Sequence, residues 1–136
     1  MTMRDSILAA RIGSPQISTD GLVTQEFCFH SDDPTFAGHF PTRPILPGIF
    51  QLEMTRLMAQ ESLNEPLAVR EITKAKFLWP IVPEQKIRVE LKLIAKDETL
   101  QARASFFAGG RSAGEAILQL AKEAKGKPQM DADKRR

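Results

Sequence analysis

The sequence predicts an α+β domain in which an antiparallel sheet of five or six strands packs against one long helix. Three features predict it: alternating hydrophobicity in the C-terminal half, a hairpin signal near the N-terminus, and one apolar helix between them. The clearest alternation covers residues 86–94, where the odd positions are apolar and the even positions before Ile94 are charged. This pattern is typical of a strand with one buried and one solvated face.

The other strands follow from the same alternation and from turn residues. Residues 99–107 and 112–121 alternate again, and Asp97-Glu98 and Gly109-Gly110 separate the three segments, which predicts a meander. Residues 70–79 supply another strand that ends before Pro80, because proline interrupts a ladder. Residues 7–17 and 22–29 flank Asp20-Gly21, which predicts an N-terminal hairpin.

We expect the only long helix to begin after Pro44-Ile-Leu-Pro-Gly48 and to end near Leu63, before Asn64-Glu-Pro66. Its apolar residues occupy most sides of the helix, which indicates burial against the concave face of the sheet.

Composition limits the class of protein. A chain of 136 residues corresponds to one domain, with 42% hydrophobic and 26% charged residues, as in soluble globular proteins. The single cysteine, Cys28, cannot form an intramolecular disulfide and is interpreted as a small buried thiol. No segment approaches the ~18 apolar residues of a membrane span, and the first ten residues do not resemble a secretory signal. We therefore expect a cytoplasmic protein without a membrane partner.

The basic excess belongs to the C-terminal end. Of 19 basic and 17 acidic residues, six and three lie in residues 122–136, so residues 1–121 carry 13 and 14. Because the tail has hardly any apolar residues, we expect residues 1–121 to form the domain and 122–136 to form a disordered polar tail. No aromatic residue interleaves with its bases, so no nucleic-acid partner is expected.

The least regular segment, residues 31–48, contains four prolines and two glycines, and such a long stiff loop inside a domain is usually functional. It contains His39, and Glu53 follows on the predicted helix. A histidine in a loop is often only exposed, whereas a carboxylate on an apolar helix is costly unless it is paired or has a task.

The segment Gly38-His-Phe-Pro-Thr-Arg-Pro-Ile-Leu-Pro-Gly-Ile-Phe-Gln-Leu-Glu53 resembles the HFPxxPxxPG signature, followed by an acidic residue, of FabZ-type β-hydroxyacyl-[acyl-carrier-protein] dehydratases. Residues 76–83, KFLWPIVP, are similar to a second stretch of that family. The glutamine, leucine and acid near position 53 are closer to dehydratases of aryl-polyene gene clusters.

The resemblance implies a hot-dog fold, in which the sheet wraps around the helix, and a homodimer with active sites shared between chains. It implies a lyase of lipid or fatty acid biosynthesis that removes water from a (3R)-3-hydroxyacyl thioester to give the trans-2-enoyl thioester. His39 from one chain would face Glu53 of the other. His39 suits the base and Glu53 the acid, provided that burial keeps the carboxyl protonated. The Gly48 N–H, at the helix start, suits the thioester carbonyl.

No metal or cofactor is expected, because this elimination is acid–base chemistry on a substrate carried by phosphopantetheine. The partner would be an acyl carrier protein or a CoA thioester. Several residues are candidate walls of the acyl channel: Phe40, Ile45, Pro47, Ile49, Phe50, Phe77, Leu78 and Trp79. Four bases are candidates for steering an acidic carrier protein: Arg43, Lys74, Lys76 and Arg111.

Some positions depart from the family pattern. Arg56 replaces a small residue and places a charge near the expected site, and Leu57 stands where glutamine is common. Two alternatives remain open: a hot-dog acyl thioesterase, and a catalytically silent acyl-binding or scaffolding subunit.

Overall fold

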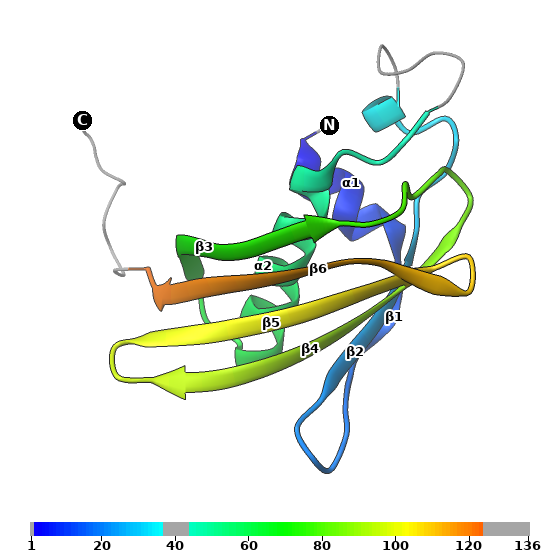
Figure 1. Cartoon of the computed structure of the whole chain (residues 1–136). Helices are drawn as coiled ribbons and strands as arrows, with labels where there is room; N and C mark the ends of the chain where they lie inside the picture. Colours follow the sequence, from blue (N-terminus) through cyan, green and yellow to red (C-terminus); the bar gives the residue numbers. More distant parts are fainter. Residues whose placement is uncertain (1, 37–43, 124–136) are drawn as a thin grey trace, which may run out of the picture.

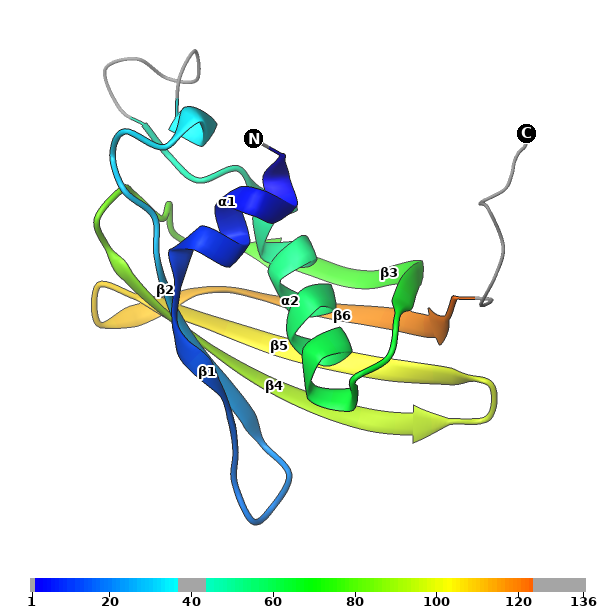
Figure 2. The same ribbon diagram turned by 180° about the vertical axis from the view of Figure 1, so that it is seen from behind.

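A computed structural model describes residues 2–36 and 44–123, and it contains one six-stranded antiparallel sheet with the long helix across one face (Figures 1 and 2). The strand order is β1-β2-β4-β5-β6-β3. The helices are α1 (Met3–Ala10), the short 3-10 turn η1 (Pro34–Phe36) and α2 (Gly48–Leu63). The strands are β1 (Arg11–Ile17), β2 (Val23–Cys28), β3 (Leu67–Phe77), β4 (Lys86–Lys96), β5 (Thr99–Ala108) and β6 (Arg111–Lys122). The α+β class with six strands is confirmed.

The predicted meander is β4, β5 and β6. Val89 pairs with Phe106, and Ala104 pairs with both Leu91 and Ala116, so apolar residues meet across all three strands on the face that α2 covers. Between β5 and β6, Gly109 and Gly110 have φ of 62° and 77°. These left-handed conformations favour glycine, which explains the turn signal in the sequence.

Helix α2 has the predicted bounds. It ends at Asn64, whose φ of 54° and ψ of 45° form a left-handed cap. Its buried face includes Phe50, Met54 and Met58, but Ile49 is 55% exposed. In this chain α2 is therefore buried on the side facing the sheet and partly open on the other.

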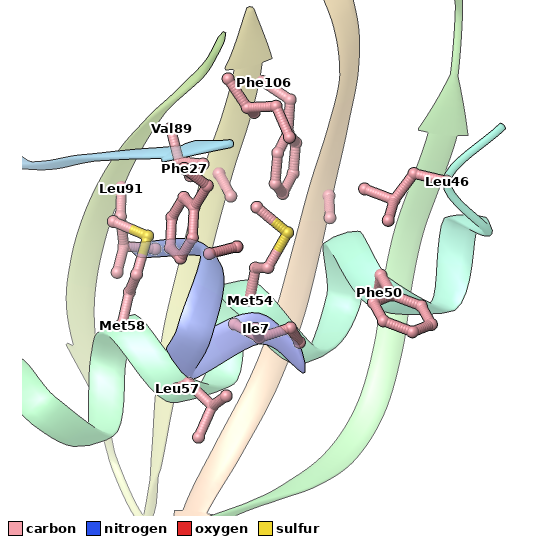
Figure 3. Close-up of a cluster of buried hydrophobic side chains, with 14 of the residues drawn as sticks. Ile7, Phe27, Leu46, Phe50, Met54, Leu57, Met58, Val89, Leu91 and Phe106 are labelled. Atoms are coloured by element: carbon pink, nitrogen blue, oxygen red, sulfur yellow. The ribbon is translucent and has the colours of Figure 1, made fainter. Parts of the chain in front are cut away.

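The hydrophobic core lies between α2 and the sheet (Figure 3). Met54 and Met58 point from the helix toward Phe27, Leu91 and Phe106 of the strands, and all five are at most 1% exposed. Burial of this kind stabilises a domain by roughly 25 cal/mol per Å² of apolar surface.

The predicted start of the N-terminal hairpin was wrong. Residues 7–10, assigned to a strand, belong to helix α1, and α2 is therefore not the only helix. The reason is a capping box: the Thr2 hydroxyl accepts from the Asp5 N–H at 3.1 Å, and the Asp5 carboxylate accepts from the Thr2 N–H at 3.0 Å. Ile7 then packs into the core from α1.

The last described residue is Glu123, whose N–H donates to the Pro66 carbonyl at 3.1 Å. Strand β6 includes Lys122, and the rest of the predicted tail, residues 124–136, lies outside the described residues. Within the described part of the chain, no helix is long and apolar enough to cross a membrane.

Candidate active site

The N-terminus of α2 begins at Gly48 with open backbone donors. Pro47 occupies the N-cap position in an extended conformation, and no side chain among the described residues caps the helix. The Phe50 N–H bonds back to the Pro47 carbonyl at 3.0 Å. The N–H groups of Gly48 and Ile49 precede that bond, and N–H groups at the start of a helix lack partners within the helix and carry the positive end of its dipole. This end of α2 can therefore bind an oxygen with partial negative charge.

A cavity of about 230 Å³ opens at this helix end. Its walls come from the chain before α2, from α2 itself, from the end of β3 and from the segment that follows: Ile45, Leu46, Gly48, Gln51, Phe77, Leu78, Trp79, Pro80 and Ile81. The Phe77 ring lies directly over Gly48, because a Cβ atom on that glycine would be 2.6 Å from Phe77 Cε2. Glycine at position 48 thus permits the ring to approach the helix end.

The structure brings some of the predicted channel residues together and separates others. Phe77 and Trp79 line the cavity, with Ile45 and Leu78. Phe50 instead lies in the core, where its ring packs edge-to-face on Phe29 at a centroid distance of 6.0 Å. Ile49 points outward, and Pro47 is the N-cap. His39 and Phe40 lie outside the described residues.

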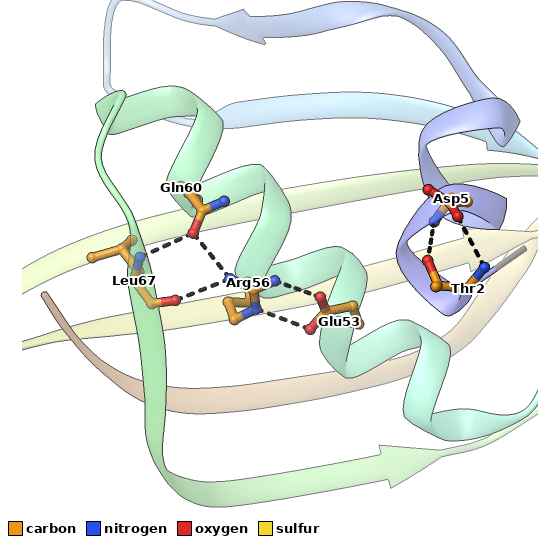
Figure 4. A network of polar contacts seen from close by, with 6 residues as sticks. All are labelled: Thr2, Asp5, Glu53, Arg56, Gln60 and Leu67. Atoms are coloured by element: carbon orange, nitrogen blue, oxygen red, sulfur yellow. Dashed lines mark hydrogen bonds and ion pairs between the residues drawn. The ribbon is translucent and has the colours of Figure 1, made fainter. Parts of the chain in front are cut away.

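Glu53 does not line this cavity but forms an ion pair along α2 (Figure 4). Arg56 Nε donates to Glu53 Oε1 at 2.9 Å and Arg56 Nη2 donates to Glu53 Oε2 at 2.5 Å. The Arg56 side chain is 17% exposed and the Glu53 side chain is 18% exposed. A two-point contact of this type fixes the position of the carboxylate as well as its charge partner.

Arg56 is itself held by other acceptors. Its Nη1 donates to Gln60 Oε1 at 2.9 Å and to the Leu67 carbonyl at 3.0 Å, and Gln60 Oε1 also accepts from the Leu67 N–H. The hydrogen bond to Glu53 raises the pKa of Arg56 above its ordinary value, against a smaller opposing effect of burial. The sequence pointed to Arg56 as a departure from the family pattern, and the structure shows that its charge lies directly on Glu53.

Gln51 is a cavity residue that the sequence pattern missed. It is 3% exposed, and its Oε1 is the buried side-chain oxygen without a hydrogen-bond partner in the described chain. The signal in the sequence was a glutamine among apolar helix positions, next to the predicted acid.

The proposed basic patch is not a cluster of free charges. Lys74 pairs with Glu115 at 2.6 Å, and Arg111 stacks over the Trp79 ring at 4.2 Å. Lys76 is exposed, and Arg43 lies outside the described residues. Three larger cavities among the described residues, of about 350, 460 and 260 Å³, contain none of the predicted site residues.

The chain is similar to known proteins in sequence and in structure. Residues 16–113 match the model of the ApeI-like family, described as ApeI dehydratase. Two similar curated proteins are both named 3-hydroxyacyl-[acyl-carrier-protein] dehydratase FabZ. One, from Aliivibrio fischeri, is 39% identical over 72 residues, which cover 46% of this chain and 48% of that protein. The other, from Bradyrhizobium sp., is 28% identical over 103 residues, which cover 69% of this chain and 66% of that protein. The chain thus spans about half to two thirds of the length of these relatives.

Solved structures share the fold. The dehydratase heterocomplex ApeI:P from Xenorhabdus doucetiae matches with a TM-score of 0.70 and 21% identity over 82% of this chain and 96% of that one. An uncharacterized protein, PH1136, from Pyrococcus horikoshii matches with a TM-score of 0.64 and 16% identity over 84% of this chain and 85% of that one. The predicted hot-dog fold is confirmed, as is the resemblance to FabZ-type enzymes with an ApeI-like branch. With 98 consecutive residues matched by the family model, this chain belongs to the ApeI-like dehydratase family.

Proposed function

We propose that the protein is a hydro-lyase that converts a (3R)-3-hydroxyacyl thioester, carried on the phosphopantetheine arm of an acyl carrier protein, into the trans-2-enoyl thioester. The observation that carries this proposal is the open N-terminus of α2 at a cavity walled by Phe77 and Trp79, in a chain of a dehydratase family. The apolar walls suit an acyl chain, and the helix end suits the thioester carbonyl.

Gly48 would stabilise the charge that develops on the carbonyl oxygen. Removal of a proton from C2 converts the thioester into an enolate, and a backbone N–H at a helix N-terminus stabilises such an oxygen where water is excluded. His39 would take the C2 proton, since a neutral imidazole is the common base at neutral pH. The C3–O bond then breaks as the C2=C3 double bond forms.

Glu53 would supply the proton that turns the leaving hydroxide into water. Arg56 donates to both of its carboxylate oxygens and holds them against its guanidinium in the single chain. Proton donation by Glu53 would require this ion pair to open. Glu53 would act in the site of a second copy, as the resemblance to FabZ-type enzymes implies.

The exposed edge of β3 supports a homodimer. β3 lies at one end of the strand order and has 11 residues, of which Val69–Phe77 are exposed in the single chain. Val69, Ile72 and Phe77 are apolar, and a long apolar edge strand is a template for pairing with another chain. A second copy seated along β3 would bury these side chains.

Replacing Ile72 with aspartate is expected to weaken this dimer. Ile72 is 50% exposed in the single chain, and a charge there would have to be desolvated at the interface. We expect the dimer dissociation constant to rise by at least about tenfold, corresponding to ~1.4 kcal/mol, and dehydration to fall with the dimer fraction. Sedimentation velocity over a range of concentrations measures this. Ile17→Asp, at a 61% exposed residue of the β1–β2 hairpin, is the matched control. If both variants had the same dimer dissociation constant as the unaltered chain, a β3 interface would be contradicted.

Replacing Gly48 with alanine is expected to impair activity with only a small loss of stability. The new Cβ would displace the Phe77 ring, at 2.6 Å, from its place over the helix end. Phe77 is 49% exposed, so its ring can move at modest cost. We expect kcat/KM to fall by about 10-fold or more, as for a disturbed oxyanion site, while the free energy of unfolding falls by at most about 1 kcal/mol. If the Gly48→Ala variant had an unchanged kcat/KM, Gly48 and Phe77 would not be part of the active site.

The proposed activity is tested by incubation with a 3-hydroxyacyl thioester on acyl carrier protein and, separately, on CoA. An enoyl thioester supports the hydro-lyase. Free acid would indicate the thioesterase, and absence of both products with both carriers would indicate an acyl-binding or scaffolding subunit.

A further inference from the structure

The guanidinium of Arg56 spends nearly all of its donors inside the described chain. Nε and Nη2 donate to the two carboxylate oxygens of Glu53, and Nη1 donates to Gln60 Oε1 and to the Leu67 carbonyl (Figure 4). An arginine has five N–H groups, so at most one is left for a ligand. The side chain is therefore built to hold its neighbours in place and not to recognise a substrate.

The acceptors of Nη1 anchor Arg56 to the start of β3. Leu67 is the first residue of that strand and is 2% exposed, and its N–H donates to Gln60 Oε1 at 3.0 Å. Both Arg56 Nη1 and the Leu67 N–H can only donate, so the Gln60 atom between them is the amide oxygen. The guanidinium is thus fixed at the junction of α2 and β3, independently of Glu53.

Arg56 is also what orients the carboxyl group of Glu53. Within residues 2–36 and 44–123, both hydrogen bonds to this carboxylate come from Arg56. A glutamate side chain has several rotatable bonds, and its freedom is lost only where a contact holds it. When the ion pair opens for proton donation, one bond can remain, because a protonated carboxyl group still accepts through its carbonyl oxygen.

We propose that Arg56 is a positioning residue, which from its anchor at Gln60 and Leu67 directs the carboxyl group of Glu53 for proton transfer. This inference rests on the proposed function and adds to it a residue that acts through the acid. A misplaced catalytic group costs rate, because the reacting atoms no longer meet in the productive geometry. Arg56 is not a wall of the cavity, so its replacement should change kcat and not KM.

The test is Arg56→Lys, assayed with 3-hydroxybutyryl-pantetheine. Lysine keeps the charge but carries its donors on one nitrogen, which cannot hold Glu53 and the Leu67 carbonyl together as the planar guanidinium does. We expect kcat to fall by about tenfold or more and KM to stay within about twofold. The matched control is Arg11→Lys, because Arg11 also donates to a glutamate of α2, Glu61 at 2.6 Å, and to a backbone carbonyl, that of Leu8 at 3.4 Å. Arg11→Lys should leave both parameters unchanged.

Combining Arg56→Lys with Glu53→Gln separates positioning from a general effect on the fold. Residues that act as one unit have non-additive effects on rate. We expect the double variant to have the kcat of Glu53→Gln within about twofold, because no proton donor is left to be positioned. A further loss as large as that of Arg56→Lys alone would show that Arg56 acts independently of Glu53, and it would overturn the inference.

Chemical denaturation shows whether each variant is folded under the assay conditions. If Arg56→Lys does not fold, Gln60→Met replaces it, since this change removes one acceptor of Nη1 and keeps the Leu67 carbonyl, and a fall of kcat by about threefold is then expected. An unchanged kcat in the folded variant, or a higher KM with kcat retained, would overturn the inference alone. Absence of dehydration by the unaltered protein would overturn the proposed function, and this inference with it.

Discussion

Replacing His39 with alanine is expected to lower kcat for dehydration by about 10²–10⁴-fold, the usual contribution of one positioned proton-transfer group. The C2 proton of a thioester is weakly acidic, so deprotonation without a base is slow even if Gly48 stabilises the enolate. Substrate affinity should change little, because the cavity walls described here, Phe77 and Trp79 among them, are untouched. Steady-state kinetics with a 3-hydroxyacyl thioester measures both parameters.

The pH profile identifies the base more specifically than the loss of rate. A base must be neutral, so kcat/KM should rise with pH through the range in which an imidazole titrates, about 6.5 when unperturbed. His39→Ala should lose this rise. The matched control is His30→Ala, because His30 is 73% exposed and lies 3.6 Å from the Glu84 carboxylate at the surface. If His39→Ala retained the rate and the pH profile, as the control His30→Ala is expected to do, a different base would be required.

The parts of the fold that were predictable are those with a local signal. The three strands of the meander follow from side chains alternating every two residues, and α2 begins and ends at Gly48 and Leu63 because proline and Asn64 restrict the backbone there. Helix α1 also has a local signal, the reciprocal hydrogen bonds of Thr2 and Asp5. Its apolar residues nevertheless suit a strand equally well, so hydrophobicity alone assigned residues 7–10 incorrectly.

The candidate site was only partly predictable for a different reason. Gly48 and Phe77 belong to motifs, and the fold brings them into contact across 29 positions of sequence. The role of Arg56 depends on what surrounds it: a carboxylate, an amide and a carbonyl. Residue type and spacing do not contain that information.

Replacing Glu53 with glutamine is expected to lower kcat by about 10²-fold or more, because glutamine cannot transfer the proton that the leaving hydroxide needs. The substitution keeps the size of the side chain, and its amide oxygen can still accept from Arg56. Arg56 also keeps its bonds to Gln60 and to the Leu67 carbonyl. Because both side chains are partly exposed, we expect the free energy of unfolding to fall by only about 1–2 kcal/mol. Chemical denaturation and steady-state kinetics measure the two effects separately.

The matched control for this prediction is Glu61→Gln on the same helix. Glu61 also pairs with an arginine, since Arg11 Nη1 donates to its carboxylate at 2.6 Å, but this pair is more exposed. Glu61→Gln should change stability by at most about 1 kcal/mol and leave kcat unaltered. If Glu53→Gln behaved in the same way, its carboxylate would serve only to balance Arg56 on α2. A large loss of kcat confined to Glu53→Gln would instead show that the protein uses this carboxylate chemically, and the ion pair with Arg56 would then be the contact that must open before the proton is given up.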